Sequence, residues 1–161
     1  ESMCAYPEVQ SIVLQELLPR MFTEIQTRGW RQLPPLVFAQ VFIQRCHTSE
    51  AMDWHQDPGE DYTVMADYSL VVMLSEQNDA THGWSGGEFK IKLGVPANDV
   101  SEQEVQTIIP QYNQAILFNN KLHSHAVTEV TTALSKAKRD LAIILLYCNG
   151  EIPRPHPWRY K

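Results

Sequence analysis

Two side chains that bind metals well, those of His55 and Asp57, lie two positions apart in the first half of the chain. In an extended segment, residues i and i+2 point to the same face, so the imidazole and the carboxylate can converge on one ion. A second histidine from elsewhere would complete the set of two histidines and one carboxylate that holds Fe(II) and leaves coordination positions open. On its own, however, a His-x-Asp tripeptide is more often a solvated turn, here before Pro58 and Gly59. The chemical interpretation therefore requires a distant histidine.

Two later histidines, His123 and His125, are candidates for the third ligand. They share one face if their segment is extended, so spacing alone does not separate them. We favour His125, because it stands directly before the Val-x-x-Val pattern of Val127 and Val130, whereas His123 would lie nearer the rim of the site. The other histidines have no carboxylate or histidine at ligand spacing and are predicted to be ordinary loop residues: His47, His82 and His156.

Four short motifs follow one another along the chain: Trp54-His55-Gln56-Asp57, Gly86-Gly87-Glu88-Phe89, His125 to Val130, and Arg139-Asp140-Leu141. In this order they resemble the motifs of the Fe(II)- and 2-oxoglutarate-dependent oxygenases, in particular the prolyl-hydroxylase-like branch. The resemblance extends from about Leu36 to Tyr147, most of the chain. It implies a double-stranded β-helix, the jelly-roll or cupin-like core of that family.

The resemblance also implies a ligand set and a co-substrate. His55, Asp57 and His125 would bind Fe(II) and act as the catalytic residues, with 2-oxoglutarate as co-substrate and ascorbate in support. Succinate and carbon dioxide would be the co-products. Arg139 would bind the distal carboxylate of 2-oxoglutarate, because a guanidinium grips a carboxylate with two parallel hydrogen bonds.

Two departures from the family pattern bear on Arg139. Glu129 stands where the family usually has proline, and the gap between the distal histidine and the basic residue is longer than usual. If residues 127–130 and 139–143 form a hairpin, Arg139 lies opposite Ala126, beside the third ligand. Lys136 and Lys138 are the alternatives for the carboxylate anchor, and a solvated basic run at the start of a strand is the non-functional explanation.

Four aromatic residues are further candidates for the site. Relatives often direct a tyrosine hydroxyl at the distal carboxylate, a role that Tyr62 or Tyr68 could fill. Tyr68 opens an apolar strand, which favours an inward ring, although a core tyrosine fits equally well. Trp54 and Trp84 flank the expected iron site and are candidate substrate-binding residues, while Trp84 also fits the role of a packing anchor.

The chain of 161 residues and 18.5 kDa has the size of one domain, 1–161. Residues 7–30 are predicted to form a helical preface, because apolar side chains recur there every three or four positions, with a bend or break at Pro19. Residues 36–148 are predicted to form a β core and residues 149–161 an extended tail. The core strands are predicted over 36–46, 68–74, 88–93, 115–118, 125–130 and 140–148. A mainly β fold with N-terminal helices on one outer face follows.

Composition excludes several classes of function. With 13 basic and 19 acidic residues the net charge is −6, which argues against binding to nucleic acid. The longest apolar stretch, residues 141–148, is far short of the roughly 20 residues that span a bilayer, and no leader is evident, so no membrane partner is expected. The 3 cysteines lack a CxxC pattern and suggest reduced thiols in the cytoplasm.

The first hypothesis is therefore an oxygenase that hydroxylates an aliphatic carbon, on a protein or peptide side chain such as proline or on a free amino acid. A second is oxidative demethylation of nucleic acid, which the acidic balance opposes, as does the lack of a second arginine just beyond Arg139. A third is a non-catalytic, cupin-like binding module, which would have no use for Arg139.

Overall fold

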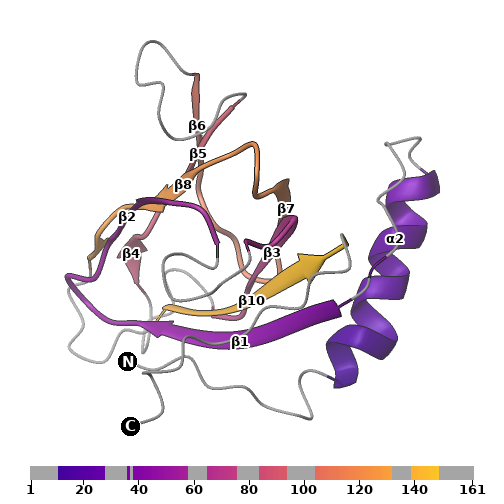
Figure 1. Ribbon diagram of the computed structural model, residues 1–161. Helices are drawn as coiled ribbons and strands as arrows, with labels where there is room; N and C mark the ends of the chain where they lie inside the picture. Colours follow the sequence, from indigo (N-terminus) through magenta and orange to yellow (C-terminus); the bar gives the residue numbers. More distant parts are fainter. Residues whose placement is uncertain are drawn as a thin grey trace, which may run out of the picture.

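Strands dominate the part of the chain that the computed structural model describes, namely residues 11–27, 36, 38–57, 65–75, 84–93, 104–131 and 139–148 (Figure 1). They form two four-stranded sheets, ordered β1-β10-β3-β7 and β2-β8-β5-β6, and a two-stranded ladder of β4 and β9. The strands are β1 (Phe38–Cys46), β2 (Met52–His55), β3 (Tyr68–Met73), β4 (Ser85–Gly86), β5 (Phe89–Lys92), β6 (Val105–Ile108), β7 (Ala115–Asn119), β8 (His125–Val127), β9 (Val130–Thr131) and β10 (Arg139–Tyr147).

A helix precedes the sheets and changes type near Pro19. The π-helix η1 (Val13–Leu17) leads directly into the α-helix α2 (Leu18–Thr27). A proline lacks the amide that the helical ladder needs, and a local π-turn accommodates such an interruption. The predicted change at Pro19 coincides with this boundary. The remaining residues of the predicted helical preface, 7–10 and 28–30, and the whole predicted tail, 149–161, lie outside the described residues.

The two faces of the first sheet are covered by different partners. Its outer face packs against α2 through a cluster that includes Leu18, Leu70 and Ile144 (Figure 1). Its inner face packs against the second sheet, where residues such as Val71 and Ile143 belong to the main hydrophobic core. Because β10 lies between β1 and β3 and is covered on both faces, nearly all of its residues are buried. A strand of this kind appears in the sequence as a continuous apolar run.

The predicted hairpin between residues 127–130 and 139–143 is wrong. β8 pairs with β2 and β5, whereas β10 pairs with β1 and β3 in the opposite sheet. Arg139 consequently stands opposite Cys46 of β1, not Ala126. The reason is burial: β10 is apolar on both faces, and the centre of the first sheet, beneath α2, covers both.

Among the described residues, neither helical segment has the length and apolar character needed to cross a membrane.

Candidate metal centre

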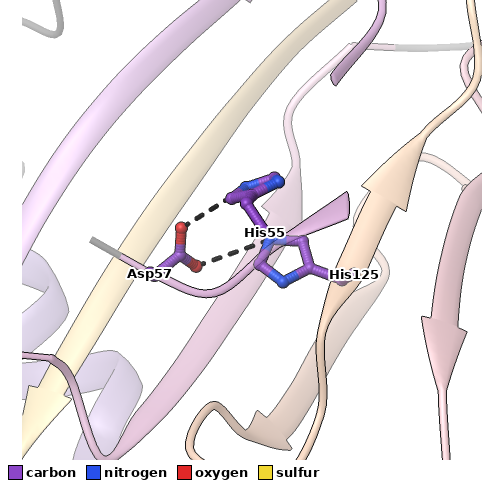
Figure 2. A group of neighbouring side chains, drawn as sticks. All are labelled: His55, Asp57 and His125. Atoms are coloured by element: carbon purple, nitrogen blue, oxygen red, sulfur yellow. Dashed lines mark ion pairs between the residues drawn. The ribbon is translucent and has the colours of Figure 1, made fainter. Parts of the chain in front are cut away.

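The second sheet brings three potential ligands together at one point. His55 and His125 are direct partners across the antiparallel pair of β2 and β8, and Asp57 follows in the turn after β2. One ligand atom from each residue lies within 4.8 Å of the others. The carboxylate of Asp57 faces both rings (Figure 2), with Oδ1 3.7 Å from Nε2 of His55 and Oδ2 3.6 Å from Nε2 of His125. These distances exceed hydrogen-bond length.

The environments of the His55 and His125 imidazoles suit metal binding through a ring-nitrogen lone pair. Nδ1 of His55 lies 2.7 Å from the carbonyl oxygen of Asp53, so an Nδ1–H that donates there leaves Nε2 free to bind a metal. His125 is 4% exposed, and its ring stacks on that of Phe89 at a centroid distance of 5.3 Å. Burial first, and then the charge of His55, lowers the pKa of His125 to about 3. The ring is therefore neutral at physiological pH, as a metal ligand must be.

Asp57 has a buried carboxylate whose negative charge is only partly offset by neighbouring protein groups. Burial raises its pKa, and a hydrogen bond of 2.8 Å from the Ser69 hydroxyl to Oδ2, followed by the charge of His55, only partly opposes this effect. A buried anion is costly unless a cation accompanies it. A divalent ion bound by the carboxylate and the two neutral rings would supply that charge, so the donor set fits Fe(II).

Asn120, which is fully buried, holds the turn that carries Asp57. Its Oδ1 accepts a hydrogen bond of 2.7 Å from the amide of Asp57. Its Nδ2 donates to the carbonyl oxygens of Asp57 and Ala66, and its own amide donates to the carbonyl of Asp67. Sequence analysis missed Asn120 and Ser69 as parts of the site, because neither belongs to a motif and Asn120 acts across 63 positions of chain.

Arg139 lies in the same cavity as the three ligands, at the start of β10. The cavity is lined by His55, Asp57, His125 and Arg139 together with Gln44, Met52, Val71, Phe89, Val127, Leu141 and Ile143. The guanidinium is buried, 1% exposed, and its Nε and Nη2 have no hydrogen-bond partner among the described residues. Its Nη1 lies 3.9 Å from Sγ of Cys46. Burial lowers the pKa of Arg139, and no carboxylate among the described residues forms an ion pair with it.

The three described aromatic candidates, Tyr68, Trp54 and Trp84, have different surroundings. Tyr68 packs with the outer cluster beneath α2, on the face of β3 opposite Ser69. Trp54 is 39% exposed, and Nζ of Lys92 lies 4.3 Å from its ring centre. Trp84 is 2% exposed, and Cζ of Arg139 lies 5.5 Å from its ring centre. The structure thus brings Trp84, but neither Trp54 nor Tyr68, against the expected carboxylate anchor.

The other predicted residues divide into two groups. His123 directs Nδ1 at the carbonyl of Lys92, 3.0 Å away, and does not belong to the ligand group. His47 lies in the turn after β1, where its amide donates to a carboxylate oxygen of Glu50. The rest lie outside the described residues: Tyr62, His82, Lys136, Lys138 and His156.

A family model described as the 2OG-Fe(II) oxygenase superfamily matches residues 41–143. The chain belongs to this superfamily. The matched segment holds the three potential ligands and Arg139. A search of curated proteins finds no match.

Solved structures share the fold of this superfamily member at low sequence identity. An oxidoreductase of the 2OG-Fe(II) oxygenase family from Burkholderia pseudomallei is 17% identical with a TM-score of 0.62, over 92% of this chain and 58% of that chain. A prolyl-4-hydroxylase from Pseudomonas putida is 14% identical with a TM-score of 0.52, over 71% of this chain and 54% of that chain. A structure of prolyl 4-hydroxylases from Phytophthora capsici is 20% identical with a TM-score of 0.57, over 89% of this chain and 43% of that chain. The chain thus spans about half the length of these proteins.

Proposed function

We propose that the protein is an Fe(II)- and 2-oxoglutarate-dependent dioxygenase that hydroxylates an aliphatic carbon. His55, Asp57 and His125 would bind Fe(II), and Arg139 would bind the distal carboxylate of 2-oxoglutarate. One observation carries this proposal: a single cavity contains both the ligand group and a buried guanidinium whose Nε and Nη2 have no hydrogen-bond partner among the described residues. A dicarboxylate that reaches from the metal to Arg139 would satisfy both.

In this reaction the protein itself would position the co-substrate and exclude water from the site. Two neutral imidazoles and one carboxylate leave a bound divalent ion with a net positive charge and with open positions for an anionic co-substrate. Arg139 would orient the other end of that co-substrate, while apolar side chains such as Phe89, Val71 and Ile143 exclude water from the space between. When bound, Fe(II) and 2-oxoglutarate would supply the oxidation of the carbon–hydrogen bond, with succinate and carbon dioxide as co-products.

The architecture that we propose is a double-stranded β-helix within a single oxygenase domain. Two facing four-stranded sheets, with ligands from β2 and β8 and the anchor from β10, support this assignment. The substrate that we propose is a protein or peptide side chain of the prolyl type, or a free amino acid. Its support is the motif resemblance together with the fold shared with two prolyl 4-hydroxylases. Trp54, exposed beside His55 on β2, is a candidate contact for that substrate.

Binding is the first test of this function. Titration of the full chain with Fe(II) and 2-oxoglutarate without oxygen should give binding of both, with metal binding lost in His55→Ala and His125→Ala. His123→Ala is the matched control, because it removes the same side chain two positions away and should retain the metal. Arg139→Ala should retain the metal and bind 2-oxoglutarate much more weakly, with an affinity that is still measurable. Retention of 2-oxoglutarate in Arg139→Ala, with loss in Lys136→Ala or Lys138→Ala, would reassign the anchor.

Turnover is the second test. Incubation with oxygen, ascorbate and a panel of peptides and amino acids should release succinate and add one oxygen atom to a panel member, detected by mass spectrometry. A chain that binds neither Fe(II) nor 2-oxoglutarate would contradict the proposal and favour a non-catalytic module.

A further inference from the structure

Arg139 and the nearby exposed arginine, Arg45, have different partners. Arg45 forms a two-pronged ion pair with Asp140, at 2.7 and 2.8 Å. Arg139 precedes Asp140 in the sequence but points to the other face of β10, and no described carboxylate forms an ion pair with it. Contacts other than ion pairs with described residues must therefore fix the direction of its guanidinium.

Trp84 supplies one of these contacts. Its ring is buried, and the centre of the ring lies 5.5 Å from Cζ of Arg139, within the range of cation–π attraction. The attraction strengthens when water is excluded, as it is here. Nε1 of Trp84 has no hydrogen-bond partner among the described residues, so the ring rather than the indole N–H makes the contact.

The backbone of Gly87 lies close to both Trp84 and Arg139. Its φ is +60°, and its amide donates a 3.0 Å hydrogen bond to the carbonyl of Glu129. A Cβ at this position would lie 3.0 Å from Cδ of Arg139 and 3.2 Å from Cζ3 of Trp84. The glycine backbone therefore lies so close to both side chains that any Cβ at this position would press on them.

We infer that Trp84 is a positioning residue for the co-substrate: its ring, backed by Gly87, holds the guanidinium of Arg139 toward the cavity. This inference rests on the proposed function, because it requires that Arg139 binds the distal carboxylate. A neutral support has a physical advantage. A protein carboxylate in the same place would compete with the co-substrate, whereas an aromatic face orients the cation and leaves its hydrogen-bond donors free.

Calorimetric titration can separate this role from simple packing. The full chain is loaded with Mn(II) in place of Fe(II) and titrated with 2-oxoglutarate. Trp84→Leu should raise the Kd for 2-oxoglutarate about tenfold, since it removes the aromatic face. Trp84→Phe keeps a ring and loses no hydrogen bond to a described residue, so it should restore the Kd to within about twofold of wild type. The affinity for Mn(II) should be unchanged in both, and Tyr112→Leu, an exposed aromatic replaced in the same way, should change neither.

A double-mutant cycle asks whether Trp84 acts through Arg139. In an Arg139→Ala background, Trp84→Leu should cause no further loss, because the side chain that it positions is absent. An equal loss in both backgrounds would overturn the inference, as would a Kd unaffected by Trp84→Leu. A wild-type chain that fails to bind 2-oxoglutarate at all would instead contradict the proposed function.

Fluorescence keeps the inference testable if Trp84→Leu does not fold. Binding of a carboxylate to Arg139 should change the emission of the adjacent indole, so 2-oxoglutarate should alter the tryptophan fluorescence of the wild type but not that of Trp84→Phe. The same change in both proteins would overturn the inference.

Discussion

At the scale of single residues, metal binding and folding make opposite demands on Asp57. Its carboxylate is buried and faces two imidazoles, which suits an ion, but the charge of the ionised carboxylate is only partly compensated in the metal-free protein. Burial raises the pKa of Asp57 above that of an exposed aspartate. The metal-free fold therefore favours the protonated carboxyl more than the unfolded chain does, whereas the metal requires the ionised form.

Asp57→Asn should consequently stabilise the metal-free protein while it abolishes metal binding. The unfolded chain releases the Asp57 proton at a lower pH than the folded chain, so ionisation of Asp57 reduces stability as pH rises through this window. The advantage of Asp57→Asn should therefore be small near pH 4 and larger at pH 7. Denaturant unfolding in the presence of a chelator measures it at both values. A variant less stable than wild type at pH 7 would contradict this account.

Asn120→Ala should affect both the fold and the metal. It leaves the buried amide of Asp57 without its acceptor, at a cost of about 1–3 kcal/mol in the free energy of unfolding. It should also weaken metal affinity about 10- to 100-fold, as loss of a group that orients a ligand commonly does. Chemical unfolding and Mn(II) titration measure the two effects.

The neighbouring asparagine is the matched control for this prediction. Oδ1 of Asn119 accepts hydrogen bonds from the amides of Lys121 and Leu122 in an exposed turn. Asn119→Ala should therefore cost less than about 1 kcal/mol and leave metal affinity unchanged. Equal effects of the two substitutions would show that Asn120 has no special relation to Asp57.

The grouping of His55, Asp57 and His125 was predictable from sequence, because His-x-Asp places two potential donors on one face and His125 opens an apolar run. Ser69 and Asn120 were not, since each acts through a hydrogen bond formed only after distant segments meet. The side on which Tyr68 lies depends on strand register, and an apolar strand start does not determine it.

At the scale of elements, the turn after β4 controls the space around Arg139. Gly87→Ala should introduce a methyl group against Cδ of Arg139 and a strained positive φ, which costs about 1–2 kcal/mol. The displaced guanidinium should bind 2-oxoglutarate several-fold more weakly, with metal affinity unchanged. Ser85→Ala, in β4, removes only exposed hydrogen bonds to Thr131 and serves as control. Unaltered binding of 2-oxoglutarate by Gly87→Ala would contradict the close contact.

Apolar runs made most of the longer strands predictable, β1, β3 and β10 among them. The short strands β2 and β6 were missed because their exposure patterns show neither an apolar run nor alternation. The pairing of β10 was predicted wrongly, because the prediction assumed a hairpin between neighbouring segments. In the structure β10 pairs with β1, and the paired residues Arg45 and Asp140 are 95 positions apart in the sequence. Sequence patterns indicate which segments are strands more readily than which strands are neighbours.

At the scale of the whole molecule, the proposed site draws on both sheets. The ligands come from β2, the turn after it, and β8, while Arg139 comes from β10 in the first sheet. Mn(II) alone should therefore slow amide hydrogen exchange mainly in β2 and β8, because binding stabilises the segments that it connects. Addition of 2-oxoglutarate should extend the protection to the start of β10. Exchange measured by mass spectrometry tests this, and protection confined to the second sheet would argue against a ligand that reaches Arg139.

The opposite directions of Arg139 and Asp140 have an evolutionary consequence. Successive residues of a strand alternate between faces, so a shift of β10 by one position would turn Asp140 inward and Arg139 toward solvent. The proposed site would then present a second carboxylate beside Asp57 and repel an anionic co-substrate. A one-residue deletion or insertion that shifts the first residues of β10 should therefore be far more damaging than a substitution there, because one step of slippage would invert the sign of the charge that faces the proposed co-substrate.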